Sequence, residues 1–161
     1  MALITMTNAR NVYAKTLFAG WGDMDFNGHM RNTAFLDKSV DVRMMFFAEN
    51  GFSMDEFVRL KFGPVVLKDE VEYRREVRLL QEIVVTLTIA GLAADGSRFI
   101  LRNEILRPDR TLCARVSSTG GWLDLVSRKL VVPPEALLAA LRSLPQTADF
   151  AALPSSVKER A

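Results

Sequence analysis

The sequence is poor in the residues that build disulfides and transition-metal sites, with one cysteine, Cys113, and one histidine, His29. A single cysteine excludes an intramolecular disulfide and fits a reducing compartment, so we expect a cytoplasmic protein. One histidine and one cysteine leave a tetrahedral zinc site short of ligands, and we expect no metal and no cofactor. Cys113 falls in a predicted strand, where we interpret it as a buried structural thiol.

An excess of one charge and long apolar runs are also missing. The 21 basic and 19 acidic residues leave a formal net charge of +2, which indicates no nucleic-acid partner. The most apolar segment, 83–94, falls well short of the roughly 18 consecutive apolar residues of a membrane span. The N-terminal segment lacks the apolar core of a secretory signal. We therefore expect no membrane partner, and a soluble chain of 161 residues is long enough to bury a core.

The first half of the chain predicts a strand followed by one long helix. Residues 11–18 are rich in strand formers, and residues 33–50 contain no glycine or proline before Gly51, a typical helix stop. Asn32 or Thr33 is the expected N-cap. Apolar side chains cover most of the circumference of this helix, so other elements must wrap it.

The second half predicts the wrapping sheet. Alternation and turn signals place strands at 65–79, 83–92, 99–106 and 111–118, the last extending with a bulge or bend through Gly120 and Gly121. A short helix follows at 133–144. Tight turns imply antiparallel neighbours, so we predict an α+β protein whose antiparallel sheet curls round the long helix. We expect a single domain over 1–144 and a polar C-terminal tail over 145–161 that frays.

The stretch GDMDFNGHMRN, residues 22–32, gathers the polar groups of most chemical interest. Asp23, Asp25, Asn27 and Gly28 match the first half of a calcium-binding loop. The twelfth position of that loop must supply a carboxylate, but it is Ala34, which excludes the calcium interpretation.

A hydrolytic site is the second interpretation of this stretch. Asp25 precedes the start of the long helix, where the first amides have no partner within the helix and carry partial positive charge. Such amides near Asn32 can hold a developing oxyanion, while Asp25 attacks a carbonyl or activates a water. The alternative is that Asp23, Asp25 and Asn27 only accept hydrogen bonds from turn amides.

The residues FAGWGDMDFNGHMRNTAFLDKSVDVR, together with FGPVVLKDEVEYRREVRLL and WLDLVSRKLVVPPEAL, resemble the hotdog-fold acyl-CoA thioesterases of the 4-hydroxybenzoyl-CoA thioesterase-like superfamily. The resemblance implies a five-stranded antiparallel sheet wrapped around one long central helix. It also implies a homodimer, with a dimer of dimers (homotetramer) as a further option, and two acyl-thioester sites across the dimer interface. The implied substrate is an acyl-CoA, hydrolysed to free acid and CoA.

The resemblance also implies roles for individual residues. The family's catalytic carboxylate falls on Asp25, the amide that polarises the thioester carbonyl on Asn32, and the turn between them on Gly28, while Asp23 becomes structural. His29 matches the motif, and we expect it to hydrogen-bond within the loop rather than act as a base.

Two positions depart from the family pattern, and the resemblance assigns no residues to the nucleotide end of the substrate. Arg31 replaces an asparagine and either meets an anionic part of the ligand or faces solvent. Phe35 replaces a common tyrosine, which makes the acyl pocket less polar. Basic residues that could meet the CoA phosphates are Lys61, Lys68, Arg74, Arg75 and Arg78, most of which we expect on a solvated sheet face.

Two other functions fit the same fold. A non-catalytic acyl-thioester-binding or scaffold dimer would keep the fold without turnover. A hydratase needs an acid and base pair that usually includes a histidine at another position, and the single His29 after the aspartate-rich loop argues against it.

Overall fold

The computed structural model describes residues 12–158 of the chain. Its strands are β1 (Tyr13–Phe18), β2 (Phe62–Tyr73), β3 (Glu82–Ala93), β4 (Arg98–Leu106), β5 (Leu112–Asp124), β6 (Leu130–Val131) and β7 (Gln146–Leu153). Its helices are α1 (Asn32–Glu49), α2 (Met54–Leu60) and α3 (Glu135–Ser143), and a short 3-10 turn covers Trp21–Asp23. No helix of this part of the chain is long and apolar enough to cross a bilayer.

The strands form one sheet whose main path has the order β1-β3-β4-β5-β2, with all neighbours antiparallel. These five strands are the sheet that the resemblance implied. Two short additions bring the total to seven, since β6 pairs with β5 and β7 pairs in parallel with β3. The expected α+β architecture is confirmed.

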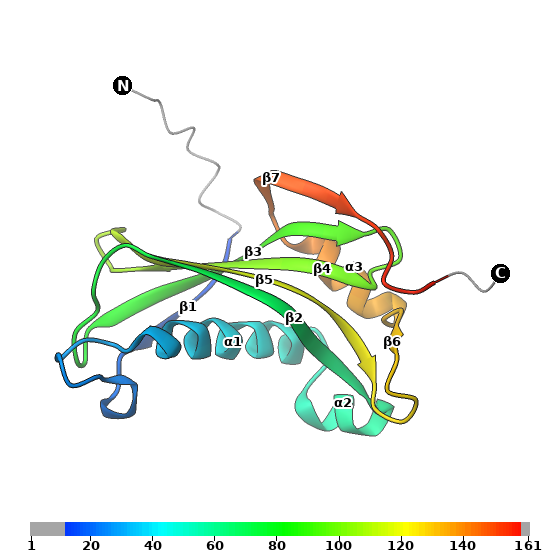
Figure 1. Ribbon diagram of the computed structural model, residues 1–161, viewed down its shortest axis with the longest axis horizontal. Helices are drawn as coiled ribbons and strands as arrows, with labels where there is room; N and C mark the ends of the chain where they lie inside the picture. The colour runs from blue at the N-terminus through cyan, green and yellow to red at the C-terminus, as the bar shows by residue number, and fades with distance from the viewer. Residues whose placement is uncertain (1–11, 159–161) are drawn as a thin grey trace.

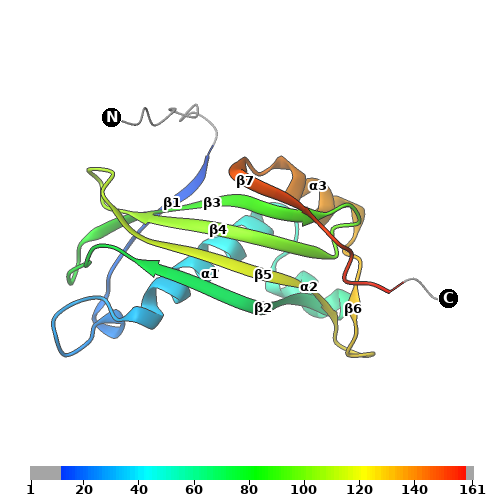
Figure 2. The same ribbon diagram turned by 45° about the horizontal axis from the view of Figure 1, so that its top comes forward.

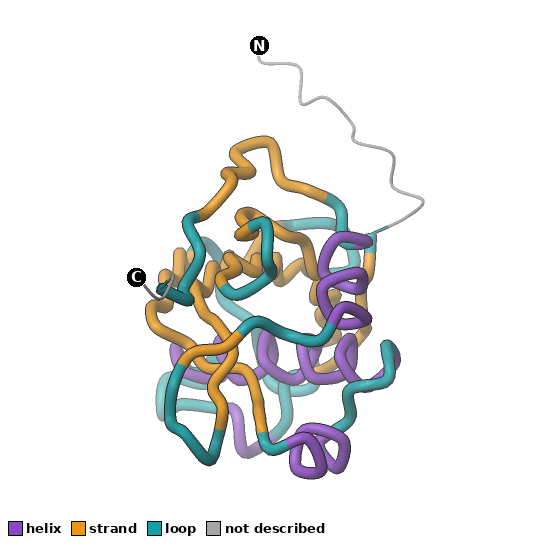
Figure 3. Tube along the Cα trace, turned by 90° about the vertical axis from the view of Figure 1, so that its right-hand side faces the viewer, coloured by secondary structure: helices purple, strands orange, loops and turns teal. Residues whose placement is uncertain are grey.

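Helix α1 lies along one face of the curved sheet, as Figures 1 and 3 show. Its buried side chains include Ala34, Phe35, Val42, Phe46 and Phe47, which face alternate residues of the strands. In β3 the inward residues Ile83, Val85, Leu87 and Ile89 are almost fully buried, which confirms the predicted alternation there.

Trp122 anchors an aromatic cluster at the α2 end of the sheet. Its ring centroid lies 5.6 Å from that of Phe47 and 5.3 Å from that of Phe99. Its indole Nε1 donates to the carbonyl of Gly96 at 3.0 Å, and the side chain is completely buried. Phe57 of α2 packs against both Phe47 and Trp122. Helix α2 was not predicted from the sequence.

The expected strand at 65–79 is wrong at its C-terminal end. β2 stops at Tyr73, and residues 74–81 cross the end of the sheet as a loop to reach β3, so β2 pairs with β5 instead of its neighbour in sequence. Alternation misled the prediction because Val77 is fully buried, although it lies in this loop. The bulge expected near Gly120 lies in the partner strand instead, where the register shifts between Val66 and Lys68.

The C-terminal tail also differs from the expectation of a frayed segment. Residues 146–153 form β7, whose backbone pairs with the second half of β3, beyond the part that β1 covers. Arg102 of β4 holds this strand through two hydrogen bonds to the Asp149 carboxylate, at 2.8 and 3.0 Å. A cross-strand ion pair and a free sheet edge therefore order a segment whose composition is polar.

Candidate functional site

The loop that precedes α1, residues 19–31, is a tight hairpin, and we call it the Asp25 loop. Asp25 N donates to His29 O at 2.8 Å, and Arg31 N donates to Asp23 O at 2.8 Å. Gly28 at its tip has a φ of 78°, in the left-handed region that glycine adopts without steric cost. This conformation agrees with the turn predicted for Gly28.

The two oxygens of the Asp25 carboxylate have different surroundings. Oδ1 accepts from Asn27 N at 2.9 Å and from His29 N at 3.1 Å, which is the turn role considered in the sequence analysis. Oδ2 makes no hydrogen bond to any residue of 12–158. The carboxylate is therefore held in place by one oxygen, and its other oxygen is left without a partner in this part of the chain.

Asp23 holds the loop against α1. Its Oδ2 accepts from Gly20 N at 2.8 Å and from Lys38 Nζ at 2.9 Å, and the side chain is largely buried. Burial alone would raise the pKa of this carboxyl, but hydrogen bonds from Lys38 and Gly20, with the nearby positive charges, lower it below its ordinary value. The structural role expected for Asp23 agrees with these contacts.

We expect Asp23→Asn to destabilise the fold at neutral pH. Because the folded-state pKa of Asp23 is lowered, its contribution is present above the ordinary value of 3.8 and is lost as the pH falls through the lowered value. Urea unfolding from pH 7 to pH 3 should show less loss of stability on acidification for this variant than for wild type. Asp41→Asn, which changes an exposed carboxylate of α1, is the control. Identical pH profiles for Asp23→Asn and wild type would contradict this role.

The start of α1 lies beside this loop and offers free backbone donors. The N-cap is Arg31, one residue before the expected Asn32 or Thr33, and no side chain caps the helix. Thr33 is the second residue of the helix, and its hydroxyl accepts from Arg31 Nε at 2.9 Å. The amides of Asn32 and Thr33 donate to no residue of 12–158. They lie at the positive end of the helix dipole, where an oxyanion is stabilised.

Arg31 does not simply face solvent. Besides Thr33, its guanidinium donates to the carbonyl of Gly22 and lies 3.6 Å from the Asp37 carboxylate. These contacts join the loop to the first turn of α1. We expected Arg31 to meet either a ligand anion or water, but within the described residues its guanidinium contacts protein groups.

His29 contacts the 74–81 loop, and Phe35 packs against the last residue of β2. His29 Nε2 lies 2.8 Å from Glu76 Oε2, so the imidazole contacts the 74–81 loop, while its backbone amide donates to Asp25. Phe35 is nearly buried and packs edge-on against the ring of Tyr73 at 5.5 Å. The Tyr73 hydroxyl donates to the carbonyl of Asn32 at 2.9 Å. Tyr73 was not predicted as a site residue, yet it supplies a hydroxyl beside Phe35.

A buried polar cluster lies deeper between α1 and the sheet, and the sequence analysis missed it. Arg43 Nε donates to Asn103 Oδ1 at 2.8 Å, and Asn103 Nδ2 donates to Thr86 O at 2.9 Å. Burial lowers the pKa of Arg43 to about 10. Its Nη2 is buried without an acceptor among the described residues. Alternation alone could not reveal this cluster, because its members come from three separate elements.

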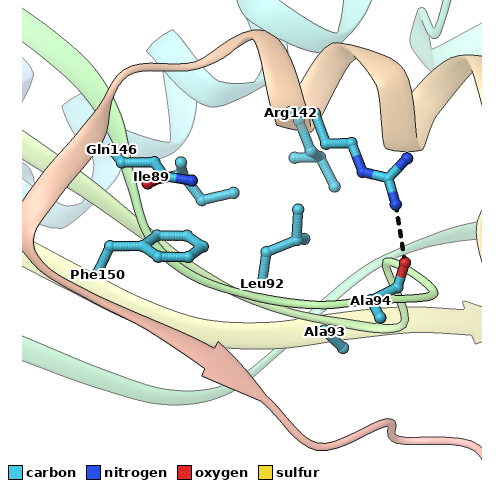
Figure 4. A pocket seen from close by; sticks show the side chains of 8 residues that line it. Ile89, Leu92, Ala93, Ala94, Arg142, Gln146 and Phe150 are labelled. Atoms are coloured by element: carbon cyan, nitrogen blue, oxygen red, sulfur yellow. Dashed lines mark hydrogen bonds between the residues drawn. The ribbon is translucent and has the colours of Figure 1, made fainter.

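A hollow of about 340 Å³ lies at the other end of the sheet, between β3, α3 and β7 (Figure 4). Ile89, Leu92 and Phe150 give it an apolar lining, and Arg142 closes one side by donating to Ala94 O at 3.0 Å. No residue of the Asp25 loop contributes to it. This hollow is therefore separate from the candidate site.

Solved structures with the same fold are similar to this chain at low sequence identity. A 1,4-dihydroxy-2-naphthoyl-CoA thioesterase from Synechocystis is 18% identical, with 81% of this chain and 96% of that chain covered and a TM-score of 0.73. A hypothetical protein from Staphylococcus aureus in complex with CoA is 20% identical, with 93% and 94% covered and a TM-score of 0.75. A DHNA-CoA thioesterase from Staphylococcus aureus is 13% identical, with 82% and 87% covered and a TM-score of 0.72. These similarities establish the hotdog fold.

Sequence comparison adds a family assignment. A search of curated proteins gives no significant match. The family model of the thioesterase-like superfamily matches residues 19–141, a span that begins with the Asp25 loop and ends in α3. Since this match covers most of the chain, the protein belongs to the thioesterase-like superfamily.

Proposed function

We propose that the protein hydrolyses an acyl-CoA thioester to free acid and CoA, with Asp25 as nucleophile or general base. The observation that carries the proposal is the pairing of a fixed carboxylate with free helix amides. Asp25 Oδ1 is held by two loop amides while Oδ2 is free of protein contacts within 12–158, and the Asn32 amide opens α1 without an acceptor there. Membership of the thioesterase-like superfamily supports this chemistry.

The reaction follows from charge development at the thioester carbonyl. Attack by the Asp25 carboxylate, or by a water that it deprotonates, places negative charge on the carbonyl oxygen. The Asn32 amide at the positive end of α1 is oriented before the reaction and stabilises that charge. Collapse of the tetrahedral species breaks the C–S bond and expels the CoA thiolate. Where water attacks, this step leaves the free acid; where Asp25 attacks, it leaves an acyl–Asp25 anhydride, which a water then hydrolyses to the free acid and the carboxylate. Phe35 and the Tyr73 hydroxyl lie beside this helix start and would contact the first atoms of the acyl group.

A free-thiol assay over a panel of aliphatic and aryl acyl-CoA substrates tests this function. We expect CoA release by the wild-type protein for at least one class of acyl group. The alternative is a non-catalytic acyl-thioester-binding or scaffold dimer, for which Asp25 only builds the turn through Oδ1. That alternative is favoured if acyl-CoA raises the melting temperature but no substrate is hydrolysed.

The active form is proposed to be a homodimer that pairs through β2. Within residues 12–158 this strand has one neighbour, β5, which leaves its outer backbone edge unpaired. Its exposed apolar residues Val66, Leu67 and Tyr73 are 48, 55 and 52% exposed. A long unpaired strand edge with exposed apolar side chains favours pairing with a second chain. Pairing there would bring a partner close to Tyr73 and the start of α1.

We expect Leu67→Glu to weaken this dimer by tenfold or more in dissociation constant. Leu67 lies at the middle of β2, so an antiparallel pairing of two copies centred on this strand brings each new carboxylate near its own copy. Like charges across a strand pair repel. Sedimentation velocity over a concentration series measures the change, with Val126→Glu on the exposed 125–129 loop as a control that keeps the wild-type state. A wild-type protein that stays monomeric throughout, or a Leu67→Glu dimer of unchanged strength, would argue against this interface.

A further inference from the structure

A second polar hollow, of about 450 Å³, lies at the end of the sheet where β2 finishes and β5 begins. Arg74, Arg75, Thr111 and Leu112 line it. The amides of Arg74 and Arg75 both donate to Cys113 O, at 2.8 and 3.0 Å, which fixes the backbone of both arginines on β5. We expected most of Lys61, Lys68, Arg74, Arg75 and Arg78 to lie on a solvated sheet face. Arg74 and Arg75 instead line a concave surface.

The charge of this hollow is only partly neutralised. Arg74 pairs with Glu72 at 3.0 Å, but Arg75 donates only to the carbonyl of Arg74, at 3.1 Å. No carboxylate of residues 12–158 forms an ion pair with Arg75 or with the neighbouring Arg110. Both are exposed, so their guanidinium groups are open to a ligand from solvent. One carboxylate, that of Asp109, lies beside Thr111 and accepts from its amide at 2.9 Å. The two arginines without an ion pair within 12–158 outnumber it, so the hollow keeps a net positive charge.

This basic hollow is tied to the Asp25 loop. Glu76, the residue after Arg75, has its carboxylate 2.8 Å from the His29 imidazole. Met30 N donates to Val77 O at 2.7 Å, so the 74–81 loop and the Asp25 loop pair directly. Figures 1 and 2 show both loops and the 107–111 turn at the same end of the molecule. A ligand lying across this end can reach both the arginines and Asp25.

We propose that Arg74, Arg75 and Thr111 bind the phosphate groups of the nucleotide end of the CoA thioester, with Arg75 as the principal ligand. This assignment rests on the proposed hydrolysis for its substrate. Guanidinium groups bind phosphate oxygens through paired, charge-assisted hydrogen bonds, and a threonine hydroxyl adds a neutral donor. The pantetheine arm, a long flexible linker, then spans the 74–81 loop and delivers the thioester to Asp25. The hollow thus sets affinity for the CoA moiety, and the acyl side remains free to vary.

Binding of 3′-phosphoadenosine 5′-diphosphate, the nucleotide end of CoA without pantetheine and thioester, tests the site directly by calorimetry. We expect Arg75→Gln to weaken binding about tenfold or more and Arg75→Lys to weaken it less, because lysine keeps the charge but not the paired geometry. Arg128→Gln, which changes an exposed arginine of the 125–129 loop, should bind as wild type. Equal affinity of wild type and Arg75→Gln would overturn the assignment.

A kinetic ratio separates this proposal from the proposed function. The measured quantity is kcat/KM for an acyl-CoA divided by kcat/KM for the same acyl group on N-acetylcysteamine, which lacks the nucleotide. Arg75→Gln should lower this ratio about tenfold, and an unchanged ratio in an active enzyme would refute the phosphate site. If the wild type hydrolyses neither ester but its nucleotide binding depends on Arg75, the hydrolase proposal fails and the phosphate site stands.

Discussion

Replacing Asp25 with asparagine is expected to lower kcat for acyl-CoA hydrolysis about a thousandfold while the protein stays folded. In the proposed mechanism the carboxylate supplies either the nucleophile or the general base, and an amide supplies neither. The turn should survive, because the asparagine Oδ1 can accept the same two hydrogen bonds from Asn27 N and His29 N. The loss therefore falls on chemistry rather than on loop structure.

A free-thiol assay and a thermal melt of the same sample measure this effect. The matched control is Asp41→Asn, the same chemical change at an exposed position of α1, for which we expect wild-type activity. A change in KM alone would indicate that Asp25 contributes uniform binding. An Asp25→Asn enzyme with full kcat would remove Asp25 from the mechanism.

Truncating Trp122 to alanine is expected to give the largest loss of stability, about 3–5 kcal/mol. The indole is completely buried and contacts four phenylalanine rings, those of Phe47, Phe57, Phe62 and Phe99. Its removal leaves a cavity that rigid strands cannot fill, and it leaves the Gly96 carbonyl without its donor.

Urea unfolding at a fixed protein concentration measures this loss, since dimerisation would make stability depend on concentration. Trp122→Phe is the matched variant: it keeps most of the ring packing and loses the hydrogen bond, so it should cost about 1–2 kcal/mol. An Ala variant destabilised no more than the Phe variant would mean that packing around Trp122 is loose.

The central helix and most strands of the main sheet could be predicted from sequence because both patterns are local. A helix with apolar residues on most of its circumference must be covered. The first eight residues of β3, Glu82 to Ile89, alternate between buried and more exposed positions. The pairing of β2 with β5 could not be predicted in this way. The 74–81 loop contains the fully buried Val77, so its apolar pattern imitates a continuing strand.

The residues of the candidate site whose positions depend on local backbone conformation could be predicted from sequence. Those whose positions depend on long-range contacts could not. Gly28 at a left-handed turn and Asp25 before a helix follow from local sequence. The contacts of Tyr73 with Asn32 and of Glu76 with His29 join residues about forty positions apart, and no periodicity encodes them. For the same reason the Arg43 cluster and the strand β7 appear only in three dimensions.

The two aspartates of the Asp25 loop allow the most direct test, because we propose opposite roles for them. Asp23 is bound to Lys38 and Gly20, whereas one oxygen of Asp25 has no hydrogen-bond partner within residues 12–158. The decisive measurement is kcat and melting temperature for Asp23→Asn and Asp25→Asn side by side. We predict that Asp25→Asn has a greatly reduced kcat and an unchanged melting temperature. We predict that Asp23→Asn has a lower melting temperature, while its folded fraction still hydrolyses substrate. Turnover retained by Asp25→Asn and abolished in folded Asp23→Asn would contradict the account.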